Sequence, residues 1–112
     1  MNLCNSTDAS LLQANQQQLD LEHKFAVQAK ALAHPARVRI IKTLLVLESM
    51  GGCLNSDLVS QLGLAQSTVS EHLRILRLAG FIIAEPNPPK TCYRINPSAN
   101  KEFISLFEQI TQ

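Results

Sequence analysis

The sequence predicts a mainly α fold with a small β-hairpin, with its elements in the order α-α-α-α-β-β-α. Two observations lead to this prediction. Apolar residues recur at helical spacing through most of the chain, and a Pro-rich segment near the C-terminal end separates two short stretches typical of β-strands. With 112 residues and no internal repeat, the chain is expected to hold one compact domain.

The first 15 residues are rich in Asn, Ser and Gln and poor in large apolar groups. Such a segment buries too little surface to offset the entropy that it loses on ordering. We therefore divide the chain into a flexible N-terminal arm, residues 1–15, and a domain, residues 16–112. The apolar pattern of the first helix starts near Leu19 and stops at His34-Pro35, because proline disfavours helix in the residue before it.

A second helix is expected to start at about Pro35, where proline fits the first turn, and to end at Gly51-Gly52. Its apolar side chains lie around much of its circumference: Val38, Ile40, Ile41, Leu44, Leu45 and Leu47. This distribution is typical of a central helix that is covered on several sides.

The next two helices form the most informative part of the sequence. A short helix capped by Asn55 or Ser56 extends through Leu62, and Gly63 gives the backbone freedom for a tight turn. The helix that follows, over about residues 66–79, has an apolar face of Val69, Leu73, Leu76 and Ala79 and a polar face of Gln66, Ser70, Arg74 and Arg77. This arrangement predicts a helix-turn-helix, whose second helix enters the major groove of DNA.

Two short strands are expected after Gly80, at residues 81–83 and 92–95, with a Pro-rich loop over residues 85–90 between them. A hairpin in this position is the wing of a winged helix-turn-helix. A final helix carries a single apolar stripe that the core of one small domain cannot cover, which predicts a homodimer. The expected dimer interface consists of Leu19, Phe25, Phe103, Leu106, Phe107 and Ile110.

The charge distribution favours duplex DNA as the partner. Residues 1–23 carry a net charge of −3 and residues 95–112 a net charge of −1, whereas residues 24–94 have nine basic and four acidic side chains. A basic middle suits a localised phosphate-binding surface. Glutamine can pair with adenine, hydroxyls can reach base edges or phosphates, and arginine can contact guanine or the backbone. The candidate DNA contacts are Gln66, Ser67, Thr68, Ser70, Glu71, Arg74, Arg77, and Lys90 and Arg94 in the wing.

Three strings, ALAHPARVRIIKTL, LGLAQSTVSEHLRILRLAGFI and CYRIN, resemble the ArsR/SmtB family of winged helix-turn-helix repressors. The resemblance covers about residues 31–96 and is sharpest over residues 70–80, in the pattern SxHLxxLxxAG. It implies a homodimer built on the first and last helices, which binds a palindromic operator until an inducer weakens binding. It also implies that Gln66, Ser67 and Ser70 read bases or contact phosphates.

Two side chains of this helix leave alternatives open. Glu71 departs from the basic or polar group that the family can place there, and it either accepts a hydrogen bond from cytosine or pairs with Arg74. His72 either touches DNA or packs against the apolar face. We expect His34 to order the break between the first two helices.

The signal that releases the protein from DNA is not evident from the sequence. The paired-cysteine motif of metal-sensing family members, ELCVCDL, is matched here by GCLNSDL, so Leu54 and Ser56 stand at the two cysteine positions. The family's second metal site uses Asp and His, and neither occurs in residues 98–112. No cofactor is predicted, and a metal or metalloid inducer remains possible.

The three cysteines, Cys4, Cys53 and Cys92, are far apart in the sequence, which favours reduced, structural thiols. Two other hypotheses remain open: the three thiolates converge on a metalloid, or two of them, such as Cys4 and Cys53, are oxidised reversibly.

The sequence has no apolar run long enough to cross a membrane and no signal-peptide pattern, so we expect a soluble cytoplasmic protein. It has no nucleophile elbow, phosphate-binding glycine loop or HExxH motif, and we predict that it is not an enzyme. The main interpretation is a dimeric DNA-binding repressor. The alternatives are a thiol-based metalloid or redox sensor of the same family, and a winged-helix protein-interaction module that does not bind DNA.

Overall fold

A computed structural model of the chain describes residues 9–112, except for the side chains of residues 56 and 57. The 3-10 turn η2 (Ala9–Leu12) precedes α1 (Gln16–Leu32), α2 (Pro35–Ser49), α3 (Ser56–Val59), the 3-10 turn η3 (Ser60–Leu62), α4 (Gln66–Leu78), β1 (Ile82–Asn87), β2 (Lys90–Ile95) and α5 (Pro97–Thr111). This confirms the predicted mainly α fold with a β-hairpin. The division of the chain at residue 15 stays a prediction, and its first eight residues lie outside the described part.

Local capping explains where the first two helices begin. Asn15 accepts a hydrogen bond from the Gln18 amide while the Gln18 side chain accepts one from the Asn15 amide, which is a capping box. At the start of α2, the His34 ring accepts a hydrogen bond from the Ala36 amide at 3.0 Å, and Pro35 occupies the first turn. The expected role of His34 in the break between α1 and α2 is confirmed.

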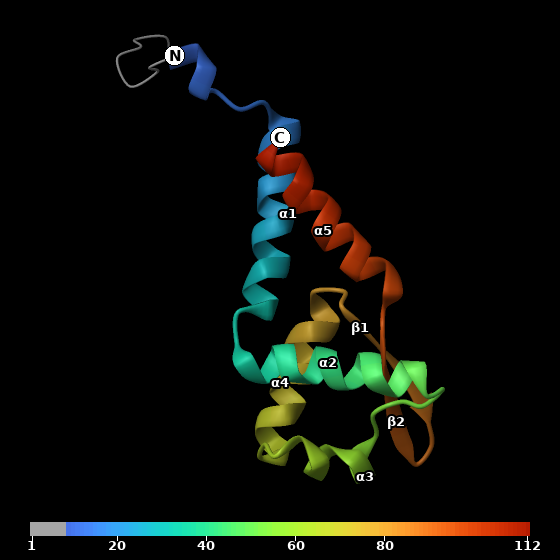
Figure 1. The fold of residues 1–112 in the computed structure, drawn as a ribbon. Helices are drawn as coiled ribbons and strands as arrows, with labels where there is room; N and C mark the ends of the chain where they lie inside the picture. The colour runs from blue at the N-terminus through green and yellow to red at the C-terminus, as the bar shows by residue number, and fades with distance from the viewer. Residues whose placement is uncertain (1–8) are drawn as a thin grey trace.

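The core lies where α2, α4, the hairpin and the start of α5 meet. Its central side chains are almost fully buried: Ile40, Leu44, Leu54, Val69, Leu76 and Phe81. Figure 1 shows α2 crossing in front of α4, with the hairpin at one end of this pair and α3 below it. The packing fixes α4 and the wing relative to each other, since both contribute to one core.

Helices α1 and α5 lie side by side and run in opposite directions, projecting together away from the core (Figure 1). Phe25 stacks on Phe103 with ring centroids 5.0 Å apart and on Phe107 at 5.4 Å. Lys24 forms an ion pair with Glu102. The helix pair, with η2 extending beyond it, gives an elongated molecule with principal extents of 62 × 24 × 21 Å (Figure 1).

The expectation that α2 is covered on several sides is wrong for one flank. Ile40 and Leu44 are buried, but Val38, Leu45 and Val46 are 53%, 39% and 46% exposed. The apolar pattern around α2 overstates its burial, because no described element packs over this flank.

The strands are longer than predicted, and the Pro-rich segment is mostly strand rather than loop. Pro86 pairs with Thr91 and Asn87 with Lys90, so Pro88 and Pro89 alone form the turn. Proline is tolerated at Pro86 because β1 is an edge strand, where a missing N–H leaves no ladder bond unmade. The wing therefore extends further from the core than the sequence analysis expected.

Candidate nucleic-acid interface

Helix α4 is amphipathic, as the sequence analysis predicted. Val69, Leu73 and Leu76 are buried on one face. The predicted DNA contacts of this helix are all exposed: Gln66, Ser67, Thr68, Ser70, Glu71, Arg74 and Arg77. Its N-cap, Ala65, makes no side-chain hydrogen bond, so no side chain caps the first amides of the helix. A helix end of this kind suits a phosphate group, because its N–H groups and its dipole favour an anion.

The side-chain pair Glu71–Arg74 sits in the middle of the exposed face. Arg74 donates through Nε to Oε2 of Glu71 at 3.0 Å and through Nη2 to Oε1 at 2.8 Å. This side-chain hydrogen bonding lowers the pKa of Glu71 and raises that of Arg74. Of the two roles left open for Glu71, the structure shows the ion pair with Arg74, which places a negative charge beside the main candidate cation of α4.

The β-hairpin meets α4 across a cavity of about 220 Å³. Gln66 and Ser70 of α4 line one side, and Lys90 of β2 lines the other. The Ser70 hydroxyl donates to the carbonyl of Gln66 at 3.2 Å, which leaves its lone pairs as acceptors. Three of the predicted DNA contacts from two separate elements thus share one surface. The same cavity is lined by Pro89, Thr91 and Tyr93, to which the sequence analysis gave no role, because only strand pairing brings them to α4.

Arg94, the second basic residue predicted to contact DNA from the wing, is held by groups of the protein itself. Its Nη1 donates to Glu48 at 3.2 Å and to the Gly52 carbonyl at 3.4 Å, and its Nε donates to Glu85 at 3.3 Å. The Arg94 guanidinium thereby connects β2 to the end of α2 and to β1. Its contact with DNA stays a prediction.

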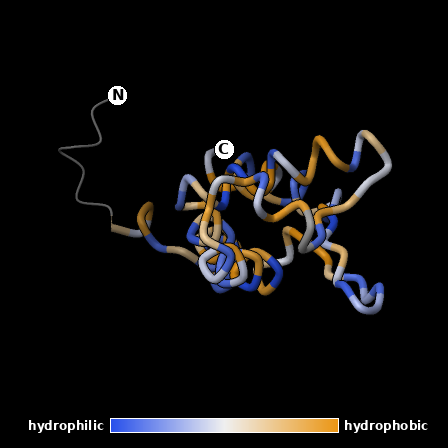
Figure 2. The backbone as a smooth tube through the Cα atoms, turned by 90° about the horizontal axis from the view of Figure 1, so that it is seen from below, coloured by the Kyte–Doolittle hydropathy of each residue, from blue (hydrophilic) through white to orange (hydrophobic). Residues whose placement is uncertain are grey.

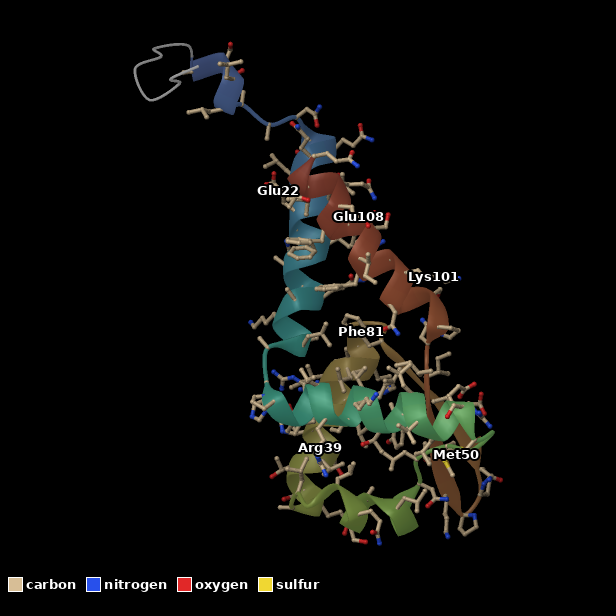
Figure 3. All side chains as sticks on the ribbon, viewed as in Figure 1. Glu22, Arg39, Met50, Phe81, Lys101 and Glu108 are labelled. Atoms are coloured by element: carbon tan, nitrogen blue, oxygen red, sulfur yellow. A yellow bond between two sulfur atoms is a disulfide. The ribbon has the colours of Figure 1, made fainter. Side chains whose placement is uncertain are left out.

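Two further arginines of the basic middle segment also connect elements. Arg37 donates from Nε to the Ala31 carbonyl at 2.6 Å, at the end of α1. Arg39, labelled in Figure 3, donates from Nε to the Leu62 carbonyl at 3.1 Å, just before the turn that leads into α4. Part of the positive charge counted in the sequence therefore serves to connect elements of the fold.

His72, on the inner side of α4, is only 6% exposed and packs against residues at the start of α2. Arg37 Nη1 lies 3.2 Å from Nδ1 of His72, and the ring of His34 lies 4.5 Å from that of His72. Because a guanidinium can only donate, Nδ1 accepts and the neutral ring carries its proton on Nε2. Burial, the neighbouring His34 and then Arg37 lower the pKa of His72. The structure thus shows a packing role for His72.

The six predicted dimer-interface residues divide into two groups. Leu106 is buried, and Phe25 and Phe103 stack on each other within the chain. Leu19, Phe107 and Ile110 remain 46%, 53% and 37% exposed. Val27 and Ile104, which the sequence analysis did not assign, are similarly exposed on α1 and α5 at 48% and 59%. The two helices thus present apolar side chains to solvent.

Cys53 and Cys92 form a disulfide, with their Cα atoms 5.7 Å apart (Figure 3). The expectation of reduced thiols is wrong for this pair, and the suggested partner of Cys53 was wrong as well. The reason is that Leu54 pairs with Tyr93 in an isolated β-bridge, which no local sequence pattern reveals. Cys4 lies outside the described residues. Within the described part of the chain, no three His, Cys, Asp or Glu side chains are grouped so that they could hold a metal ion.

Comparison with known proteins agrees with this architecture. A family model described as "Bacterial regulatory protein, arsR family" matches residues 34–84. An uncharacterized HTH-type transcriptional regulator of Mycobacterium tuberculosis H37Rv is 34% identical over 82 residues, which are 72% of this chain and 68% of that protein. Another from Methanocaldococcus jannaschii is 33% identical over 81 residues, 72% of this chain and 88% of that one. The solved structure of reduced HlyU from Vibrio cholerae is similar with a TM-score of 0.64 at 26% identity, over 88% of this chain and 100% of that one.

In the described part of the chain, the helices are too short or too polar to cross a membrane. The relatives are transcriptional regulators, which agrees with the prediction that the chain is not an enzyme. The fold agrees with the sequence match and with the similar solved structures. This chain therefore belongs to the ArsR family of transcriptional regulators.

Proposed function

We propose that the chain is a dimeric repressor that binds a palindromic operator in duplex DNA and is released from it by a chemical signal in the cytoplasm. The observation that carries this proposal is the division of α4 into a buried apolar face and an exposed face of polar and charged side chains. Such a face offers hydrogen bonds to base edges and positive charge to phosphates. A face that binds a protein partner would be expected to carry more apolar groups. On α4, all of which the structure describes, Leu78 is the one large apolar side chain that is exposed to solvent, and the rest of the exposed face is polar or charged.

The roles within α4 follow from position. Gln66, Ser67 and Thr68 stand at its N-terminal end, where a recognition helix contacts base edges and where uncapped amides favour a phosphate oxygen. Ser70 and Arg74 follow one and two turns later on the same face, and Arg77 extends it. We assign Gln66 to base reading and Arg74 and Arg77 to guanine or phosphate contacts.

The wing supplies a second contact from a different element. Lys90 stands across a shared cavity from Gln66 and Ser70, so a groove occupied by α4 would bring Lys90 close to the adjacent backbone. Arg94 is held between Glu48 and Glu85, and we assign it to anchoring the wing, with its charge adding to the potential around Lys90.

Dimerisation follows from the apolar side chains on the outer side of α1 and α5. Leu19, Phe107 and Ile110 are exposed in the single chain, and a second copy with the same stripe can bury them through a two-fold axis. Two copies related in this way present two α4 helices, and a palindromic operator matches that symmetry.

The direct test is DNA binding by the purified chain to the DNA upstream of its own gene, titrated at several salt concentrations. We expect affinity to fall steeply as salt rises, because Lys and Arg release counterions from phosphates. Arg74→Ala should weaken binding by about 1–3 kcal/mol and lower the salt slope by about one. Lys101→Ala is the matched control, since Lys101 is exposed on α5, away from α4 (Figure 3).

Binding that is absent, or that does not depend on salt, would contradict the proposal and favour a protein-interaction module. An equal loss of affinity from Lys101→Ala would show that Arg74 contributes net charge rather than a contact at the α4 face.

A further inference from the structure

The bridge between Cys53 and Cys92 joins the loop before α3 to the wing by a covalent bond, in addition to the packing and hydrogen bonds that already hold them together. Cys53 lies in the loop between α2 and α3, and Cys92 lies in the second strand of the wing. Their Cα separation of 5.7 Å is the usual distance for a disulfide, so the bond requires no rearrangement of the backbone.

The backbone itself brings these sulfurs together. Leu54 and Tyr93 exchange two hydrogen bonds, of 3.0 and 2.8 Å, so that residues 53–55 lie against β2 like a short third strand. Cys53 and Cys92 are therefore diagonal neighbours across a strand pair, within reach of each other whether oxidised or reduced. A dithiol that is already positioned in this way closes to a disulfide without a search for its partner.

The segment closed by this bond is the DNA-reading part of the molecule. The two cysteines are 39 residues apart in sequence, and the segment between them contains α3, the turn, α4 and β1. Without the disulfide, the wing strand is still connected to this loop by the core packing of Leu54, by the Leu54–Tyr93 hydrogen bonds and by Arg94, which donates to the Gly52 carbonyl. The disulfide adds a covalent restraint to these contacts.

We infer that Cys53 and Cys92 are a redox-active thiol pair, oxidised by a hydroperoxide, whose disulfide fixes the wing beside α4 and thereby strengthens operator binding. The effect on DNA rests on the proposed function, whereas the chemistry of the pair does not. In this structure the disulfide is formed and the polar side chains of α4 and Lys90 already share one surface. A preorganised site binds more tightly, because less conformational freedom is lost on binding.

The reaction balances as a two-electron oxidation. Cys53 is the more exposed of the two, whereas Cys92 is 7% exposed, so the Cys53 thiolate attacks the peroxide. The sulfur–oxygen bond forms as the oxygen–oxygen bond breaks, which leaves a sulfenic acid on Cys53 and one alkoxide or hydroxide. The Cys92 thiol then displaces water from that sulfur. Hydrogen peroxide is thereby reduced to two waters, and the two thiols lose two protons and two electrons.

The chemical test uses the full chain with Cys4→Ser, which leaves Cys53 and Cys92 as its thiols. Maleimide labelling should count two thiols after reduction and none after one equivalent of hydrogen peroxide, with the chain remaining uncrosslinked on a non-reducing gel. In the Cys4→Ser/Cys92→Ser variant, peroxide should leave a sulfenic acid on Cys53 that dimedone traps. Thiols that survive peroxide, or a disulfide between chains, would overturn the inference.

A second readout follows the wing without DNA. Hydrogen exchange at the Leu54 and Tyr93 amides, which bond to each other's carbonyls, should be faster in the reduced Cys4→Ser chain than in the oxidised one. Equal exchange would show that the disulfide does not fix the wing.

The third readout is operator affinity of the oxidised and reduced Cys4→Ser chain. The oxidised form should bind about fivefold or more tightly, and a Cys53→Ser/Cys92→Ser variant should bind equally with and without peroxide. Equal or weaker binding by the oxidised form overturns the regulatory role. If neither form binds DNA, the proposed function fails, and thiol counting and hydrogen exchange still decide whether the pair is redox-active and fixes the wing.

Discussion

Helices α4 and α5 are both amphipathic, but they differ in the chemistry of their exposed faces. Both bury an apolar stripe in the same molecule, with Val69 and Leu73 on α4 and Leu106 on α5. The other face of α4 is polar and basic, whereas α5 exposes Ile104 and Phe107. Figure 2 shows how hydrophobic and hydrophilic residues alternate along the helical segments. Helical periodicity predicts that each helix has a buried face. The chemistry of the opposite face indicates the kind of partner: nucleic acid for a polar and basic face, and a protein surface for an apolar one.

The two regions also differ in how they are held. The part that we propose to read DNA is closed by the disulfide and supported by Arg39 and Arg94. The paired helices α1 and α5 project from it (Figure 1). An extended pair of helices with exposed apolar side chains leaves more surface uncovered than a compact domain would. This supports a second copy as the partner of that region.

The largest expected effect comes from placing a charge on the apolar face of α5. Phe107→Asp should raise the dissociation constant of the dimer by about 30- to 1000-fold, or about 2–4 kcal/mol, because a carboxylate cannot be buried there without a partner. Sedimentation equilibrium measures this directly, and operator affinity should fall with it. Gln109→Asp is the matched control, since it adds the same charge two residues further along α5, on another side of the helix.

A Phe107→Asp chain that still sediments as the wild-type dimer would show that the apolar face of α5 is not the dimer interface. Thermal unfolding should accompany the experiment, since Phe107 also stacks on Phe25.

A smaller effect is expected from removing the carboxylate on the polar face of α4. Glu71→Gln should strengthen DNA binding by about three- to tenfold, because it removes repulsion from phosphate and releases Arg74 from its ion pair. Equilibrium binding to the same operator at fixed salt measures the change. A loss of affinity confined to operators with one particular cytosine would instead show that Glu71 reads that base.

The double variant Glu71→Gln/Arg74→Ala separates two roles of Arg74. If Arg74 contacts DNA, the double variant should bind DNA more weakly than the single variant Glu71→Gln, because only the double variant lacks that contact. Recovery to wild-type affinity would mean that Arg74 serves mainly to neutralise Glu71. The experiment thus decides whether Arg74 contacts DNA directly or neutralises the charge of Glu71.

The smallest effect concerns the junction between the two regions, where His72 of α4 lies against His34 and Arg37. Burial lowers the pKa of His72 in the folded chain. As the pH falls through about 6.5, His72 takes up a proton in the unfolded chain but not yet in the folded chain. The free energy of unfolding therefore decreases as the pH drops below that value. Glu71 opposes this shift but does not reverse it.

Urea unfolding at several pH values between 7.5 and 5.5 measures the dependence, and His72→Gln should make it shallower. The exposed His23, on α1, provides the control, and His23→Gln should keep the wild-type slope. An unchanged slope in His72→Gln would show that His72 does not resist protonation in the fold.

The division of α4 into a buried and an exposed face could be predicted because it depends on local sequence patterns. The apolar spacing of α4, the left-handed Gly63 at φ 70° before it, and the polar residues from Gln66 to Arg77 are all features of short segments. These patterns gave the bounds of α4 to within one residue at its C-terminal end. Local periodicity predicts a helix and its faces well, because neighbours three and four residues apart interact directly.

Local sequence patterns were enough to predict the order of the elements, the break between helices at His34-Pro35 and the exposed polar face of α4. The tertiary structure alone decided that Cys53 meets Cys92 and that Arg94 lies between Glu48 and Glu85. Both depend on pairing between segments some 40 residues apart, and the core and strand register select that pairing from many that local sequence would permit.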